Sequence, residues 1–143
     1  MDFVIKGLLT NLTPSEKIFL ISHPSHVTTI RDNANTASRE AHRRFARNGL
    51  YNGVGDAFRH CYWSAMLARD IGVENATRFT TAHEAYDANP AQERAMDLHN
   101  NSVGVAIGKA HPNANDSVLA LFCIDALNEE KLMTSLPETG EAY

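Results

Sequence analysis

The sequence lacks internal repeats, low-complexity tracts and the alternation of apolar and polar residues that marks a β-strand. These absences exclude repeat and β-sheet architectures. Charged residues are also scarce, at 21% of 143 residues, whereas 43% are hydrophobic. A chain of this length and composition can bury a core of its own. We therefore expect one helical domain over residues 1–143, with a frayed tail over 137–143.

Basic residues are fewer than acidic residues. The chain has 13 Lys and Arg against 17 Asp and Glu, and its formal net charge is −4. Capture of nucleic acid by overall electrostatic attraction requires an excess of basic residues. The arginines that cluster locally are Arg39, Arg43, Arg44 and Arg47. Their spacing is typical of a solvated helix face, with a phosphate-binding patch as the alternative, so nucleic acid is an unlikely partner.

No apolar run is long enough to span a membrane, and cysteine is rare. Residues 1–9 are too short and lack the basic start of a signal peptide. We expect synthesis in the cytoplasm and export by a dedicated secretion system. Cys61 and Cys123 lie in apolar helical contexts without metal-site spacing. Buried free thiols are the main prediction for them, and an interhelical disulfide is the alternative.

Helix signals run through the chain. The capping box over residues 13–16 predicts a short helix that stops before Pro24. A longer helix should run from about residue 25 to the Asn48-Gly49 pair, and residues 113–116 should cap a final apolar helix. The sequence therefore predicts an all-α, compact orthogonal bundle of five to seven helices. We expect the segments near 56–70, 74–87 and 91–109 to pack on one another.

Polar and titratable side chains concentrate in three of these segments, at residues 55–63, 82–84 and 96–101. At about 100° per helical residue, the first segment gathers its polar side chains on a stripe that leads into the core. The residues of this stripe are Asp56, Arg59, His60 and Trp63. The loop before it contains Asn52-Gly53, a pair that favours positive φ and a tight turn.

The second segment places His83 on the apolar side of a helix, facing inward. Asp87 follows one turn later, where it could orient the imidazole. Glu84 projects about 100° away, so it would reach a site only from the rim or pair with a neighbouring helix. We therefore expect substitution of His83 to cost more activity than substitution of Glu84.

In the third segment, Asp97 and Asn101 share a stripe with Gly104 and Gly108, whereas Asn100 lies on the apolar stripe. Two glycines at helical spacing allow a neighbouring helix to come close. Asp97 and Asn101 should therefore lie at a helix contact.

Each of these residues also has a purely structural interpretation. His83 could be a hydrogen-bonded core histidine, Asp56 a helix N-cap, and the asparagines partners of backbone groups at a bend. Burying several titratable groups without pairing them is costly, however. We therefore predict a functional site within residues 52–108, where His60 and His83 converge with Asp97 or His99.

Histidines together with acids suit a divalent metal ion, zinc or a similar ion. The predicted metal ligands are His60, His83 and either His99 or Asp97. Without a metal, a histidine would act as general base, oriented by Asp56 or Asp97, while Arg59 stabilises an oxyanion or phosphate. The candidate catalytic residues are His60, His83, Asp97, Arg59, Asp56 and Glu84, and the candidate substrate-binding residues are Asn100, Asn101 and Trp63.

The succession Gly-Asp-Ala-Phe-Arg-His-x-x-Trp, Ala-His-Glu and Met-Asp-Leu-His-Asn-Asn-x-x-Gly resembles an uncharacterised bacterial helical domain. That domain is associated with C-terminal toxin modules of large secreted, Rhs-type and wall-associated proteins. The similarity spans residues 52–108 and implies an all-α catalytic or toxic module. We expect the segment to be free-standing here, without a delivery domain ahead of it. A free-standing segment is consistent with an exported effector, a phage-borne protein or a domesticated relative.

From these features we predict an antibacterial effector that hydrolyses an ester or phosphoester bond, in lipid or another cell-envelope component. A cognate immunity protein would be its partner. A non-catalytic binding module with a buried polar network is the first alternative. A nuclease toxin is the second, and the acidic charge balance disfavours it.

Overall fold

The computed structural model describes residues 12–85 and 89–137. Its helices are α2 (Pro14–Ser22), α3 (Val27–Arg44), α4 (Val54–Ile71), α5 (Val73–His83), α6 (Ala91–Ala110) and α7 (Asp116–Asn128), with short 3₁₀ turns at Pro24–His26 and Arg47–Gly49. No strand occurs in these residues. The all-α prediction is confirmed, and the six α-helices of the described residues fall within the predicted range of five to seven.

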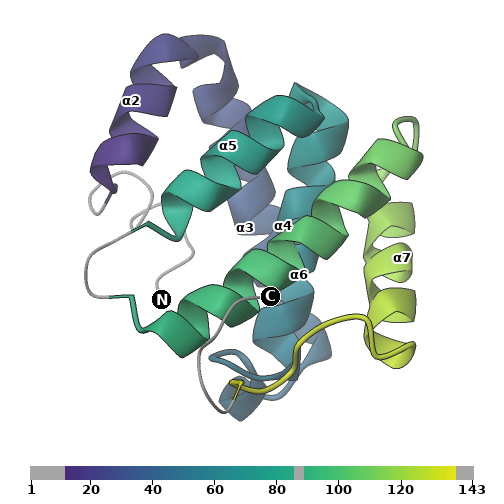
Figure 1. The fold of residues 1–143 in the computed structure, drawn as a ribbon. Coiled ribbons are helices and arrows are strands. Elements are labelled where there is room, and N and C mark those ends of the chain that lie inside the picture. The colour runs from purple at the N-terminus through teal and green to yellow at the C-terminus, as the bar shows by residue number, and fades with distance from the viewer. Residues whose placement is uncertain (1–11, 86–88, 138–143) are drawn as a thin grey trace.

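Helix α4 lies at the centre of the packing. It contacts α3, α5, α6 and α7, and 15 of its 18 residues are buried. In Figure 1, α6 crosses in front of α4, α7 stands along one side, and α2 lies next to α5. A helix that is buried all round must find partners inside the protein for each of its polar side chains. The polar residues of the 55–63 segment are therefore forced into a buried network.

Helices α4 and α6 approach closely because α6 presents glycine at the contact. A Cβ added at Gly104 would lie 2.1 Å from the carbonyl oxygen of Cys61, and one at Gly108 would lie 2.3 Å from that of Ala65. The close approach predicted from the two glycines is confirmed. It presses Asp97, on the N-terminal half of α6, against α4, where its exposed fraction is only 4%.

The capping signals are confirmed at two helices. The Thr13 hydroxyl accepts from the N–H of Glu16, and the carboxylate of Glu16 accepts from the N–H of Thr13, which completes a capping box for α2. Asn115 caps α7 in the same region that the sequence indicated. The predicted frayed tail lies outside the described residues, apart from Pro137.

Two helix boundaries differ from the prediction. Helix α3 ends at Arg44 rather than near Gly49, because Phe45 is extended and the chain then makes a 3₁₀ turn. Helix α4 begins at Val54 with Gly53 as its N-cap. Asp56 therefore lies inside the first turn, and its interpretation as an N-cap is wrong.

Candidate metal and catalytic site

Three carboxylates surround the imidazole of His60. Nε2 lies 3.4 Å from Asp56 Oδ1 and 3.3 Å from Asp97 Oδ1, while Nδ1 lies 3.6 Å from Glu84 Oε2. We call these four residues the carboxylate cluster. Asp56 and His60 belong to α4, Asp97 belongs to α6, and Glu84 directly follows α5. None is more than 4% exposed. Residues of all three predicted segments meet here, and of the side chains expected to converge His60 and Asp97 lie together.

Asn101 fixes the orientation of His60. Its Oδ1 lies 3.2 Å from His60 Nδ1 and accepts from Ser64 Oγ at 3.1 Å, and its Nδ2 donates to Glu84 Oε2 at 3.3 Å. Since an amide oxygen only accepts, Nδ1 of His60 carries a proton. Nε2 then faces Asp56 and Asp97, which is the orientation that second-shell hydrogen bonds impose on metal-binding histidines.

Arg59 and the preceding turn hold Asp56 in place. Arg59 Nη2 donates to Asp56 Oδ1 at 2.6 Å, and the backbone N–H of Asn52 donates to Oδ2 at 2.8 Å. Asn52 has a φ of 56°, so the tight turn predicted from Asn52-Gly53 is confirmed. Burial alone would raise the pKa of Asp56. The charges of His60 and Arg59, together with the Asn52 N–H, instead hold it well below its ordinary value.

The pKa values of His60 and Asp97 shift upward instead. Burial lowers the pKa of His60, but Asp97, Asp56 and Glu84 outweigh burial and raise it to about 9. Burial raises the pKa of Asp97 to about 7, against the charge of His60. Three acids thus share one imidazole and one guanidinium, so the site contains more negative than positive groups.

The arrangement could hold a metal ion. Across the described residues, the group whose ligand atoms lie close enough to share an ion is Asp56, His60 and Asp97, with all three atoms within 4.8 Å of one another. Buried Asp97 Oδ1 and Glu84 Oε1 accept no hydrogen bond from any described residue. Carboxylate oxygen and imidazole nitrogen are ligands that zinc and similar divalent ions accept. The donor set therefore fits a divalent cation.

His83 lies in a different pair. Its Nδ1 is 2.8 Å from Glu16 Oε2, which comes from α2, and its ring meets Trp63 edge-on with centroids 5.2 Å apart. The sequence suggested Asp87 as the acid that orients His83, and that residue lies outside the described part of the chain. The orienting carboxylate in the structure belongs to Glu16. The sequence indicated only the capping-box role of Glu16 and gave no sign of its contact with His83.

His99 and Asn100 face the C-terminal segment. His99 Nε2 lies 2.9 Å from the carbonyl oxygen of Lys131, and Asn100 exchanges two hydrogen bonds with the backbone of Met133. The histidines proposed as a ligand set, His60, His83 and His99, are therefore distributed over three different contacts. Among the described residues, Asp56 and Asp97 accompany His60 instead.

Glu84 follows the second of the two alternatives that the helical wheel left open. It does not lie at the rim: it is fully buried and pairs with neighbouring helices through His60 and Asn101. Helix α5 packs against α2 on one side and against α4 and α6 on the other. Consecutive residues at its end therefore enter different contacts: His83 turns to α2 and Glu84 to the carboxylate cluster. Ser64, one turn after His60, was also missed, although its position on α4 was a usable signal.

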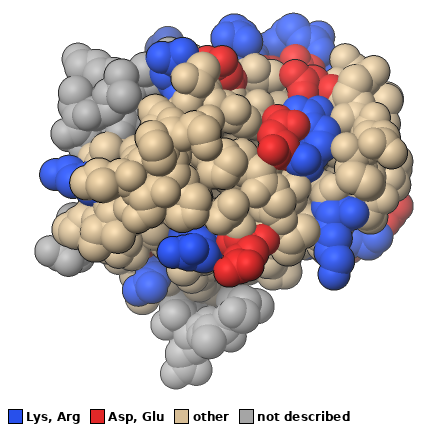
Figure 2. Space-filling model, turned by 90° about the horizontal axis from the view of Figure 1, so that it is seen from above, with Lys and Arg blue, Asp and Glu red and all other residues tan. Residues whose placement is uncertain are grey.

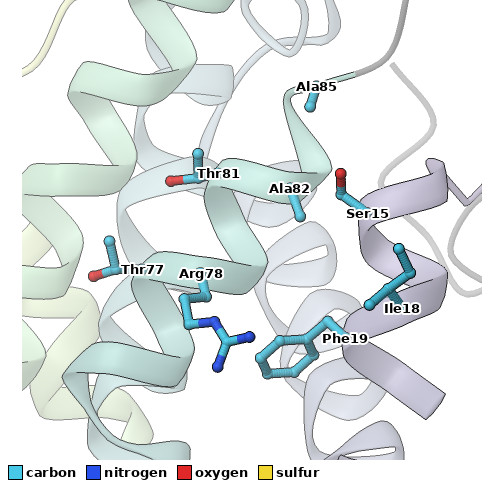
Figure 3. Close-up of a pocket in the computed structure, with 8 residues that line it drawn as sticks. All are labelled: Ser15, Ile18, Phe19, Thr77, Arg78, Thr81, Ala82 and Ala85. Carbon is cyan, nitrogen blue, oxygen red and sulfur yellow. The ribbon is translucent and has the colours of Figure 1, made fainter. Parts of the chain in front are cut away.

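Two surface hollows border α5. A cleft of about 140 Å³ between α5 and α6 is lined by Asn101, Ser102 and three threonines, so it reaches the residue that orients His60. A groove of about 490 Å³ lies between α2 and α5, beside the Glu16–His83 pair. Figure 3 shows Phe19 and Arg78 facing each other in this groove, with the guanidinium 5.8 Å from the ring centroid. Thr77 and Thr81 point away from Phe19.

Charges on the face shown in Figure 2 are dispersed. Basic residues form separate patches, several with acidic residues beside them, around a broad uncharged area. Among the described residues seen in this view, the basic side chains do not join into a continuous surface of the kind that nucleic acids bind. None of the described helices combines the length and the hydropathy that crossing a bilayer requires.

No solved structure matches the chain. Residues 17–131 match a family described as a domain of unknown function, DUF6973. The matched region includes the whole carboxylate cluster, the Asn101 amide and the cysteines of α4 and α7. The chain therefore belongs to the DUF6973 family.

Proposed function

We propose that this protein is a hydrolase that cleaves an ester or phosphoester bond with the help of a divalent cation held by Asp56, His60 and Asp97. One observation carries the proposal. Three buried carboxylates converge on a single imidazole, and two of their oxygens accept no hydrogen bond from the described residues. Buried charge that is not compensated costs several kcal/mol, by order of magnitude, so such a site is retained where it serves binding or chemistry.

The residues around the cation site have distinct roles in this proposal. A divalent cation supplies Lewis-acid chemistry and makes water a stronger nucleophile at neutral pH. Glu84, on the Nδ1 side of His60, would supply the proton acceptor through Oε1, because Asn101 holds Oε2. Arg59 positions Asp56, and Asn101 positions both His60 and Glu84. The cleft between α5 and α6 gives the reacting group its path to Asn101.

The substrate class follows from surface chemistry and from the resemblance to toxin-associated domains. The acidic net charge and the dispersed charges on the face seen in Figure 2 disfavour nucleic acid, so we propose an ester or phosphoester of a lipid or another cell-envelope component. The protein would then act as an exported antibacterial effector, neutralised in the producing cell by an immunity protein.

Hydrolysis assays test the proposal. Purified protein, first stripped with a chelator, is incubated with Zn²⁺, Mn²⁺ or Mg²⁺ and a panel of p-nitrophenyl esters, bis-p-nitrophenyl phosphate and phospholipid vesicles. We expect hydrolysis that requires a cation and is lost in Asp97→Asn. Asp32→Asn makes the same change at a side chain that is 61% exposed and should retain activity. Equal rates in the two variants would exclude the cluster as the reaction centre.

Complete burial of the cluster favours one other function. The hydrogen bonds of Asn101 to His60, Ser64 and Glu84 could specify helix packing in a binding module without catalysis. Under that alternative, Asp97→Asn lowers the melting temperature and cation addition changes nothing. Under the hydrolase proposal, the variant folds stably and loses both the response to cations and hydrolysis.

A further inference from the structure

The two cysteines of the chain meet at the contact between α4 and α7. Cys61 Sγ and Cys123 Sγ lie 3.3 Å apart, and neither residue has any exposed surface. A disulfide bond is about 2.05 Å long, so the sulfurs are about 1.2 Å from bonding distance. Small side-chain rotations and a slight shift of one helix cover such a difference.

Helix α7 is anchored on both sides of Cys123. At its start, Tyr62 Oη donates to the carbonyl oxygen of Asp116 at 2.9 Å, and Arg69 pairs with the Asp116 carboxylate at 2.8 Å. After its end, Asn100 holds the backbone of Met133. Folding therefore brings the two thiols together before any bond forms, which raises their effective concentration toward each other.

We propose that Cys61 and Cys123 form an intramolecular disulfide that fastens α7 to α4 when the protein encounters a disulfide oxidant. A thiolate of the pair attacks the oxidant, forms a mixed disulfide and releases one thiol. The second cysteine then attacks the mixed disulfide and releases the other thiol. Two S–H groups of the protein become one S–S bond, and the oxidant disulfide becomes two thiols. This modification site is independent of the proposed hydrolase activity.

The bond would close a loop that contains Glu84, Asp97 and Asn101. Cross-linking residues 61 and 123 restricts the unfolded chain and stabilises the fold that assembles the carboxylate cluster. The pair is buried, and a hydrogen bond with Cys61 together with burial holds the pKa of the Cys123 thiol well above its ordinary value. Oxidation of the folded protein should thus be slow and oxidation during folding fast.

Peptide mapping with thermal melts tests the proposal. The full chain is refolded from denaturant with reduced and oxidised glutathione, unfolded in an alkylating agent, and mapped by mass spectrometry without reduction. We expect a cross-linked Cys61–Cys123 peptide and a melting temperature about 5–10 °C above that of the same protein kept reduced. Cys61→Ala and Cys123→Ala should each melt at a temperature that does not depend on redox conditions.

Two results would overturn the proposal. One is alkylation of both cysteines in the refolded protein, which shows that no bond forms. The other is an oxidised protein that melts no higher than the reduced one, which shows that the bond does not fasten the helices. Both measurements use the wild-type protein, so the test remains valid even where a cysteine variant fails to fold.

Discussion

Two histidines of this protein face carboxylates, yet their surroundings differ. Near α2, Glu16 gives one oxygen to the N–H of Thr13 and the other to His83, so a single acid is fully hydrogen-bonded. Between α4 and α6, His60 meets three acids, and two of the buried oxygens accept no hydrogen bond within the described residues. A balanced pair joins two helices, whereas an excess of buried acid indicates a place for a cation.

The largest expected effect is the loss of hydrolysis on substitution of Asp97, which belongs to the His60 environment and not to that of His83. Asp97→Asn removes a predicted ligand and should reduce cation-dependent hydrolysis at least about 10³-fold. Because burial raises the pKa of Asp97 to about 7, its ionised form is disfavoured in the folded protein. At pH 8 without cation, the variant should therefore unfold with a free energy higher by about 1–2 kcal/mol. Urea unfolding measures this difference. A metal-free variant that is less stable than the metal-free wild type would contradict an excess of buried acidic groups at the site.

Glu84 and His83 give the next largest contrast, because they are consecutive in sequence but belong to different contacts. Glu84→Gln should lower kcat by about 10²-fold through loss of the proton acceptor. His83→Ala should change kcat by less than about threefold and mainly lower stability. This ranking reverses the one expected from the helical wheel.

Rates at matched folded concentration check this ranking. Glu129→Gln is the control, because its side chain is 56% exposed. A His83→Ala protein that is folded but inactive would move the reaction centre to the Glu16–His83 pair.

Glu16→Gln should affect stability but not cation binding. The change weakens both the capping box and the bond to His83, so the free energy of unfolding should fall by about 1–3 kcal/mol. The response of the melting temperature to added cation should remain that of the wild type. Loss of that response would show that the two histidine environments form one site.

The last expected effect is a pH dependence of the metal-free protein. Folding raises the pKa of Asp97 from 3.8 to about 7 and that of His60 from 6.5 to about 9. The folded state thus binds more protons than the unfolded state, and stability should fall as pH rises from about 4 to 9. A cation competes with these protons, so its stabilising effect should grow over the same range. Melts at pH 5, 7 and 9 measure both trends, and a pH-independent cation effect would contradict them.

Much of the architecture could be predicted from local signals. The capping box at Thr13, the Asn-Gly turn before α4 and the glycines of α6 each act within one or two turns, so the sequence alone reveals them. The stripe of Asp56 and His60 also follows from helical period. These features predict the helices and the inward polar face of α4, whereas the central place of α4 is seen only in its contacts with four other helices.

The partners of each histidine could not be predicted in the same way. A helical wheel shows which residues share a face, but it does not show how many neighbours a helix has. Because α5 packs between α2 and the α4–α6 pair, both His83 and Glu84 are directed at another helix, and only one of them reaches the cluster. The contact of Glu16 with His83 could not be predicted for another reason: the local capping box already accounted for an acidic residue at this position.

Calorimetric titration of the chelator-stripped protein with Zn²⁺ or Mn²⁺ tests the central claim most directly. Wild type and Glu16→Gln should bind one equivalent of cation with the same affinity and release protons at pH 7, since the cation displaces them from His60 and Asp97. Asp97→Asn should bind at least about 100-fold more weakly. Equal binding by wild type and Asp97→Asn, or no binding by either folded protein, would contradict the account of the carboxylate cluster as a cation site.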